Sequence, residues 1–406
     1  MFEAFAERDY RRFWLTQFIS NLGSWMQVVA QGWLVYRLTD SGYLLGFVGF
    51  ASSIPTLFLM LPGGVVADHF DRRRVVSLSQ WAQALSALFL AVAIRTGQIS
   101  VWQIIAASFV VGIAISFSAP AWQAMVVDLL DDRDHLPNAI AMNSLQFNLS
   151  RALGPLLAGV TLAAWGSFWC FFFNAISFLP LIFVLGRIKR RQQPVAATGA
   201  ILTRLADGLR YVRTQRVVVL LLVVVAAASL FGYAYIALMP MVARALFAQN
   251  DAHGLAVLMG GIGAGALTGS LALASRMPPP ATIVRAILGG IATLGVAIAA
   301  AGFARAELLV VALLFVCGAA GVYSVALCNT SIQQRIPDAM RGRVLSMYTF
   351  AFFAFVPFGN LIGGMLAERW GYGIAFGVLG GALVLAAVIA AAIKPETRNQ
   401  KPESAG

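Results

Sequence analysis

The sequence predicts an all-α integral membrane protein, and its composition carries that prediction. Hydrophobic residues make up 60% of the 406 residues, whereas Asp, Glu, Lys and Arg make up only 11%. Soluble globular proteins carry about 25% charged residues, so this chain has too little charge to cover a water-facing surface. A soluble enzyme and a disordered chain are both excluded. The lipid bilayer is therefore the expected surroundings of most of the surface.

Twelve apolar stretches are long enough to cross a bilayer, because a transmembrane helix needs about 20 residues. Cutting the chain at charges and at Gly/Pro turns places the predicted helices at residues 12–37, 43–67, 75–95, 101–126, 139–164, 167–187, 216–247, 253–275, 282–303, 307–331, 343–367 and 371–393. The first follows a charged stretch and is too long for the core of a signal peptide, so we expect no cleavage.

The basic residues predict the orientation. The net charge is +12, and Lys and Arg concentrate in cytoplasmic loops of membrane proteins. With both termini inside, the outer loops would hold only Arg37, Arg95, Arg244, Arg305 and Arg369. We therefore predict cytoplasmic termini. The basic surplus serves topology, and no nucleic-acid partner is expected.

A central polar segment predicts two six-helix halves. Residues 188–215 are the longest polar gap between the predicted helices, and residues 201–215 within it form a candidate amphipathic helix on the inner leaflet. The predicted organisation is an N-terminal half at 1–187, a cytoplasmic basic linker at 188–215, a C-terminal half at 216–393 and a cytoplasmic tail at 394–406.

An internal repeat supports the two halves. The pair Trp165–Gly166, after the fifth predicted helix, recurs as Trp370–Gly371 after the eleventh. At the same shift Gly154 and Gly159 match Gly359 and Gly364. Parallel repeats of this kind occur in secondary transporters, in which the substrate binds between the halves.

The loop after the second helix carries a specific motif, Gly64-Val-Val-Ala-Asp68-His69-Phe70-Asp71-Arg72-Arg73-Arg74. It resembles the signature Gly-x-x-x-Asp-Arg-x-Gly-Arg-Arg/Lys of the major facilitator superfamily. Gly64, Asp68, Arg72 and Arg73 match, whereas His69 and Asp71 depart from it. The resemblance implies the major facilitator fold.

The motif predicts a cytoplasmic gate. Gly64 permits close helix approach, and Asp68 can meet the positive N-terminal end of the eleventh helix. That contact would have to break for the cytoplasmic side to open. Alternatively, the arginines only set topology. The predicted gate residues are Gly64, Asp68, Arg72, Arg73, Asp128, Arg341 and Arg343.

The fifth helix contains Gly154-Pro155 followed by Gly159, which resembles a motif of exporters and antiporters in the superfamily, with a tail one residue longer. Gly and Pro kink a helix and permit tight packing.

Arg151 has the highest expected free-energy cost of any residue in the predicted helices, because its charge lies near the middle of the fifth helix and so near the middle of the membrane. Asn148 shares its helical face. Arg151 either attracts an anionic or electron-rich substrate, or takes part in coupling, or holds the first half together by bonding helix-end carbonyls or Asp128. The pattern leaves these alternatives open.

A polar stripe at helical spacing marks the first helix. Amides facing lipid would be unsatisfied, so the stripe meets either a cavity or neighbouring helices, and we favour the cavity. Aromatic residues add a candidate wall, with packing or an interface belt as the alternative. The predicted cavity residues are Gln17, Asn21, Ser24, Gln27, Gln31, Trp122, Asn148, Arg151, Tyr233 and Tyr323, and Trp25 and Tyr235 extend the wall.

Several types of chemistry have no residues to support them. No acid falls in the middle of a predicted helix, so Asp128 and Asp40 are the candidates for proton coupling. A Walker A loop is missing, which excludes ATP-driven transport by this chain. The cysteines and histidines are scattered, and we expect no metal, no cofactor and no enzymatic activity.

Further segments resemble the enterobactin-exporter-like branch of the superfamily, including Asn21-Leu-Gly-Ser-Trp-Met-Gln, Pro120-Ala-Trp-Gln-Ala and Asn148-Leu-Ser-Arg-Ala-Leu-Gly-Pro. The resemblance implies a monomer in the bacterial inner membrane. It would export a medium-sized organic molecule, such as a siderophore, a macrolide or another drug-like compound, by alternating access with H+ antiport. The alternatives are an importer or lipid flippase of the same fold, and a membrane sensor without flux.

Overall fold

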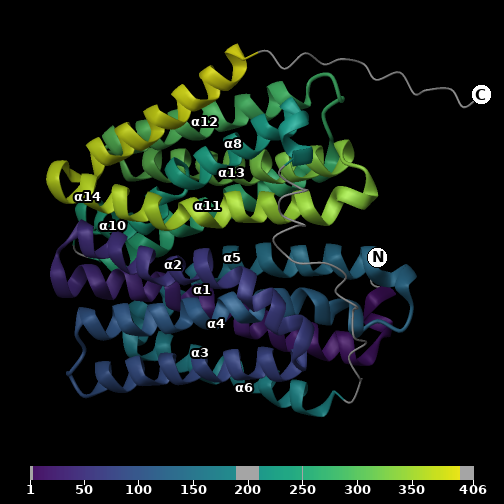
Figure 1. The fold of residues 1–406 in the computed structure, drawn as a ribbon. Helices are drawn as coiled ribbons and strands as arrows, with labels where there is room; N and C mark the ends of the chain where they lie inside the picture. Colours follow the sequence, from purple (N-terminus) through teal and green to yellow (C-terminus); the bar gives the residue numbers. More distant parts are fainter. Residues whose placement is uncertain (1–2, 189–209, 249, 394–406) are drawn as a thin grey trace, which may run out of the picture.

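The computed structural model describes residues 3–188, 210–248 and 250–393, and its regular elements in these ranges are helices (Figure 1). The first part contains η1 (Glu3–Ala6), α1 (Arg8–Thr39), α2 (Gly42–His69), α3 (Arg72–Arg95), α4 (Val101–Asp128), η2 (Arg133–His135), α5 (Leu136–Trp165) and α6 (Ser167–Arg187). The second part contains α8 (Arg216–Phe231), α9 (Ala234–Ala237), α10 (Met239–Leu246), α11 (Asp251–Ser275), α12 (Ile283–Phe303), α13 (Glu307–Arg335) and α14 (Asp338–Ala392). Most of the predicted linker and the whole predicted tail lie outside the described residues.

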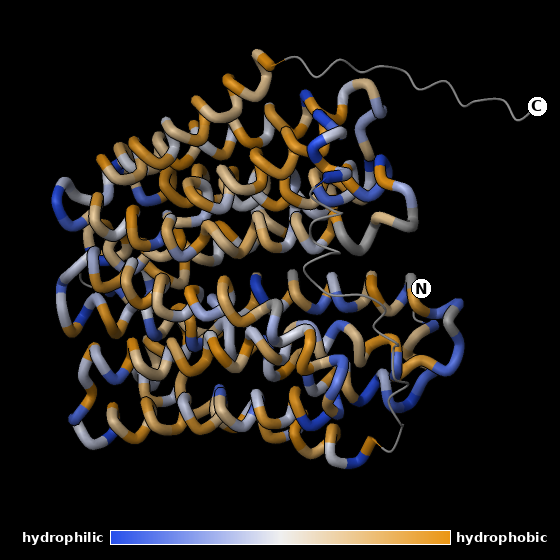
Figure 2. Tube along the Cα trace, viewed as in Figure 1, coloured by the Kyte–Doolittle hydropathy of each residue, from blue (hydrophilic) through white to orange (hydrophobic). Residues whose placement is uncertain are grey.

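The helices have the polarity expected of a membrane protein. Hydrophobic residues run along them and hydrophilic residues gather in the turns at both ends (Figure 2). Within the described ranges, nine helices are long and apolar enough to cross a membrane, with α14 counted once. α1 and α5 are not among the nine, although they have 32 and 30 residues. They carry the polar stripe and Arg151, which lower their mean hydropathy.

The helices form two groups (Figure 1). In the first group α1 packs on α5 and α6, α3 packs on α4 and α6, and α2 packs on α4. In the second group α11 and α12 pack on α13, and α14 packs on α8 and α12. Two helix pairs make most of the contact between the groups, namely α2 with α14 and α5 with α11.

Small residues bring α5 and α11 together. A Cβ atom added to Gly159 would collide with the side chain of Ala256. A Cβ atom on Gly263 would lie 3.0 Å from the Cα of Ala152. Without a hydrophobic drive between helices in lipid, such close backbone approach is a main source of helix association. Gly159, a residue of the predicted exporter motif, thus lies at the contact between the two groups.

Glycine residues also bring α2 and α14 into close contact. A Cβ atom on Gly46 would collide with the carbonyl oxygen of Asn360, and one on Gly364 would lie 2.6 Å from the carbonyl oxygen of Gly42. We call these two sets of close glycine contacts the glycine ladders. Both glycine ladders lie in the halves of their helices nearer the α1–α2 turn. We call that end of the bundle the α1–α2 end and the opposite end the α2–α3 end.

The internal repeat appears in the backbone. Gly166 has φ 87° and ψ 175°, and Gly371 has φ 79° and ψ 161°. Both follow a Trp, and both make a tight turn between two helices in a conformation that favours glycine. α14 is therefore two helical stretches joined at Gly371, as α5 and α6 are joined at Gly166.

We predict that Gly159→Leu destabilises the protein by about 1–3 kcal/mol, because the added side chain overpacks the contact with Ala256. The measurement is the Tm of the purified protein in detergent. Gly289→Leu on α12 is the matched control, since Gly289 is exposed and its added Cβ meets no atom within 4 Å. An unchanged Tm in Gly159→Leu would contradict the tight α5–α11 contact.

Candidate functional site

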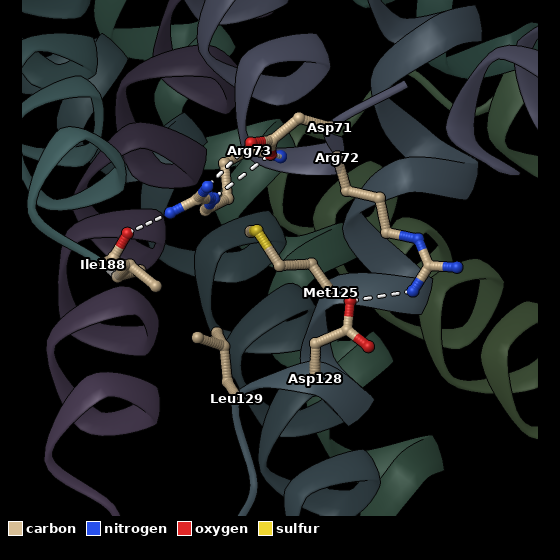
Figure 3. Close-up of a pocket in the computed structure, with 7 residues that line it drawn as sticks. All are labelled: Asp71, Arg72, Arg73, Met125, Asp128, Leu129 and Ile188. Carbon is tan, nitrogen blue, oxygen red and sulfur yellow. Dashed lines mark hydrogen bonds and ion pairs between the residues drawn. The ribbon is translucent and has the colours of Figure 1, made fainter. Parts of the chain in front are cut away.

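The loop between α2 and α3 folds into a cluster of charged residues (Figure 3). Asp71 caps the N-terminus of α3 by accepting a hydrogen bond from the backbone N–H of Arg73, at 3.0 Å. The Arg73 guanidinium lies 2.7 Å from the Asp71 carboxylate and also donates to the backbone carbonyl of Ile188. The hydrogen bond from Arg73 holds the pKa of Asp71 below its ordinary value. Asp71 therefore keeps its negative charge to lower pH than an ordinary aspartate does.

Arg72 connects three helices. It is buried, its Nη1 lies 2.7 Å from Oδ2 of Asp128 at the end of α4, and its Nε donates to the carbonyl of Ala67 on α2 at 3.2 Å. A buried guanidinium needs such partners. Asp128 is consequently the partner of Arg72, and the alternative in which it pairs with Arg151 is wrong. The charged loop binds α2, α3 and α4 to each other.

The remaining predicted gate residues do not come together in this conformation. Asp68 is exposed and pairs with none of the described side chains. A Cβ atom on Gly64 would meet nothing within 4 Å, and the close approach to α4 occurs instead at Gly63, against Ser116. The side chains of Arg341 and Arg343 lie outside the described ones. The contact of Asp68 with the start of α14 therefore stays a prediction.

The α1–α2 end carries a set of polar contacts between the groups that the sequence pattern did not single out. Glu368 of α14 accepts hydrogen bonds from the Ser41 hydroxyl at 3.1 Å and from the Tyr43 backbone N–H at 3.2 Å. A carboxylate at the N-terminus of a helix is favourable, and here it caps α2 from the other group. Arg244 pairs with Asp40 at 3.2 Å.

Sequence reasoning could have found Glu368 only as an acid near a helix end. Its partner is 327 positions away in the chain, and no local spacing encodes that distance. Arg244 was counted as an outer-loop charge, and Asp40 as a candidate for proton coupling. Their ion pair places the α1–α2 turn beside the end of α10.

The polar stripe of α1 binds neighbouring helices. Gln27 accepts a hydrogen bond from Asn174 of α6 at 2.6 Å, and Gln31 donates to Ser108 of α4 at 3.0 Å. Asn21 donates to Gln146 of α5 at 3.4 Å. For these three residues the geometry favours helix-to-helix bonding, the alternative that the sequence analysis ranked second.

The other members of the stripe bond within α1. Gln17 donates to Asn21 at 2.9 Å, and the Ser24 hydroxyl donates to the Ser20 carbonyl at 2.9 Å. The Oε1 of Gln17 is buried and accepts no hydrogen bond from the described residues. A role of Gln17 and Ser24 in lining a cavity stays a prediction.

Arg151 lies between aromatic rings from both groups. Its guanidinium carbon is 6.0 Å from the ring centroid of Trp25 on α1 and 5.6 Å from that of Tyr233, between α8 and α9. The two rings contact others in turn, Trp25 with Phe147 and Tyr233 with Phe352. Arg151, Trp25 and Tyr233 are far apart in the sequence, and the fold brings these three predicted residues together.

The other predicted cavity residues lie elsewhere or outside the described side chains. Tyr235 is buried against Phe376, and Tyr323 packs on the hydrophobic core. Trp122 lies beside Phe13, with its ring centroid 6.2 Å away. The side chain of Asn148 is outside the described ones.

The exporter motif has two contact faces. A Cβ atom on Gly154 would collide with Trp25 and lie 3.2 Å from the Leu22 carbonyl of α1. Pro155 is buried beside it. Gly159 faces α11 in the other group. α5 therefore uses one glycine for packing within its own group and the other for contact between groups.

The fold and these contacts define a helical membrane transporter of the major facilitator type. The chain belongs to the transmembrane secretion effector family of that superfamily, whose family model matches residues 1–405. The family and the relatives below are transporters rather than enzymes.

Two curated relatives cover nearly the whole chain. The staphyloferrin A transporter of Staphylococcus aureus is 24% identical over 384 residues, covering 91% of this chain and 92% of that protein. The multidrug efflux pump Tap of Mycolicibacterium fortuitum is 26% identical over 383 residues, again covering 91% and 92%. The solved structure of a D-xylose–proton symporter matches with a TM-score of 0.73 and 16% identity over 95% of this chain and 98% of that chain. That structural match supports the fold alone.

We predict that Glu368→Ala loosens the α1–α2 end, because α2 loses the carboxylate that caps it. Two exposed hydrogen bonds to a charged group stabilise the contact between the helix groups by about 1 kcal/mol. The ratio of molecules in which the groups are separated at the α1–α2 end to molecules in which they are in contact should therefore rise about fivefold. The measurement is the distance distribution between spin labels at Leu38 and Trp370, both exposed at this end.

Glu307→Ala is the matched control. Glu307 is an exposed acid in the first turn of α13 and has no partner among the described residues, so its loss changes the charge equally without breaking a contact. An unchanged distribution in Glu368→Ala, or an equal change in Glu307→Ala, would refute the capping role of Glu368.

Proposed function

We propose that this protein is a secondary active exporter of medium-sized organic molecules, of the siderophore or drug-like kind, working by alternating access with H+ antiport. The supporting observation is the one-sided contact between the two helix groups. The glycine ladders, the Glu368 cap and the Asp40–Arg244 pair all lie at the α1–α2 end. This is the arrangement expected of one of the two end states of a rocking transporter.

The proposed topology has twelve spans and cytoplasmic termini. It counts α1 to α6, the broken helix α8–α10, α11 to α13, and the two stretches of α14 on either side of Gly371. The halves 1–187 and 216–393 are the proposed moving units. With the basic loops inside, the closed α1–α2 end faces outward, and the conformation is inward-facing.

The α2–α3 end supplies the proposed cytoplasmic gate. Arg72 and Arg73 are already bound within their own group, to Asp128 and Asp71. Asp68 is the acid of the motif left exposed. In the outward-facing state we expect it to meet the N-terminus of α14, where the positive end of the helix dipole favours a carboxylate.

Proton coupling is proposed to act at the α1–α2 end. Asp40 and Glu368 are carboxylates in contacts between the groups, and protonation of either would weaken its contact. The proton would then favour separation of the groups on the outer side. No acid of the described ranges lies in the middle of a helix to serve instead.

We predict that Asp68→Asn abolishes transport, because the neutral amide loses the charge that meets α14. The measurement is uptake of a fluorescent dye, a siderophore and a macrolide into energised everted vesicles, in which an exporter accumulates its substrate. A protonophore should prevent the accumulation. Glu307→Gln is the matched control, since it neutralises an exposed acid that lies outside the charged cluster, and transport should persist.

The outcomes distinguish the competing functions. Accumulation in everted vesicles supports export, whereas loss of preloaded substrate from them identifies an importer. Movement of a labelled phospholipid between leaflets, without uptake of the soluble compounds, identifies a flippase. Substrate binding with no flux in the native protein identifies a sensor. Full activity of Asp68→Asn would refute the proposed gate.

A further inference from the structure

Arg151 is a mid-membrane cation without an acidic partner. It stands halfway along α5, which spans Leu136–Trp165. Among the described residues its guanidinium contacts the rings of Trp25 and Tyr233 and hydrogen-bonds to the Tyr233 hydroxyl, and no carboxylate forms an ion pair with it. Asp128, the acid that the sequence offered as a partner, is occupied by Arg72. The charge of Arg151 is therefore not neutralised within the described chain.

The rings stabilise the charge but leave most of its bonding capacity unused. A cation near an aromatic face is attracted by the quadrupole of the ring. A guanidinium also has five N–H donors in a planar fork, and these need oxygen acceptors. A carboxylate fits that fork through two parallel hydrogen bonds. Trp25 and Tyr233 offer the guanidinium one oxygen, the hydroxyl of Tyr233, which accepts a hydrogen bond from Arg151, so donors of the fork are left for an anion.

The surroundings of Arg151 provide apolar and aromatic surface from both helix groups. Trp25 and Phe147 meet edge to face at 5.9 Å, and Tyr233 and Phe352 at 5.4 Å. Tyr233 stands in the break between α8 and α9. Transporters commonly place substrate sites at such breaks, at the interface between the repeats.

We propose that Arg151 binds the carboxylate of an organic monoanion whose aromatic or other planar apolar body lies against Trp25, Phe147, Tyr233 and Phe352. The inference rests on the proposed transport function and names its substrate class. A single negative charge fits best, because Arg151 is the one cation that contacts the rings of Trp25 and Tyr233 among the described residues. A dianion would leave one charge unpaired in a region of low dielectric constant.

The geometry also connects binding to movement. Arg151 and Trp25 belong to the first helix group, and Tyr233 belongs to the second. A carboxylate that takes up the N–H donors of Arg151 changes its cation–π contact with Tyr233, which joins the groups. Occupancy of the site therefore alters the contact between the two moving units.

The test is binding of matched compounds to the purified full-length protein in detergent, measured by calorimetry. The probes are 2-naphthoate and N-acetyltryptophan, each compared with its neutral carboxamide. For the native protein we expect each carboxylate to bind at least about tenfold more tightly than its amide. Arg151→Gln should remove that preference, and Arg151→Lys should retain part of it, because Lys keeps the charge but not the fork.

Each outcome decides the proposal. Equal affinity of the native protein for carboxylates and amides, or no binding of either carboxylate, overturns it. An undiminished carboxylate preference in Arg151→Gln also overturns it. If Arg151→Gln does not fold, as judged by Tm and gel filtration, Tyr233→Leu and Trp25→Leu replace it and should weaken binding of 2-naphthoate at least about threefold, with no weakening counting against the proposal.

The experiments distinguish a failure of the proposed export function from a failure of the proposed anion site. Carboxylate binding that depends on Arg151, without flux in everted vesicles, supports the anion site and refutes the exporter. Flux of neutral or cationic dyes that is unchanged in Arg151→Gln, with no carboxylate preference, supports the exporter and refutes the anion site.

Discussion

The constraint on which this structure depends is that lipid forms no hydrogen bonds. Every polar group along a helix must find its partner inside the bundle or at its ends. The amides of α1 accordingly bond to α4, α5 and α6, and Arg72 is buried against Asp128. These contacts fix the relative positions of helices within one group. They are directional and numerous, whereas the contacts between groups rely on glycine.

That difference in bonding supports the proposal that each helix group is rigid and that the two groups move relative to each other. Close packing of small residues, as between Gly159 and Ala256, stabilises a contact without any directional bond that must be exchanged for another. Apart from the contact of Arg151 with Tyr233, the polar contacts described between the groups lie at the exposed α1–α2 end, where water can replace them at little cost. Contacts of these two kinds can break without leaving a buried polar group unpaired.

Much of the fold was predictable because the length of the apolar stretches and the positions of the glycines at turns can be read from short segments of the sequence. The Trp–Gly repeat predicted two equivalent turns, and Gly166 and Gly371 have nearly the same φ and ψ. Helix spacing placed the amides of α1 on one face, but spacing cannot tell a cavity from a neighbouring helix, since both satisfy an amide. The partners Asn174, Ser108 and Gln146 are known only once the helices pack.

The candidate site shows the same limit more sharply. Depth along α5 identified Arg151, because a mid-membrane charge is rare. Whether that charge is neutralised depends on where the acids lie in space, and the sequence left Asp128 open as a partner. The fold assigns Asp128 to Arg72, two helices away from α5 along the chain.

The assignment of Asp128 also gives the charge of Arg151 its significance. A scaffold that needed an arginine only for cohesion could satisfy it as Arg72 is satisfied, with a carboxylate at 2.7 Å and a backbone carbonyl. Arg151 instead meets two rings that belong to different helix groups. Cation–π contacts and the Tyr233 hydroxyl stabilise part of the charge, and they leave further N–H donors for the proposed substrate. A cation that meets no carboxylate among the described residues is suited to a cargo rather than to the scaffold.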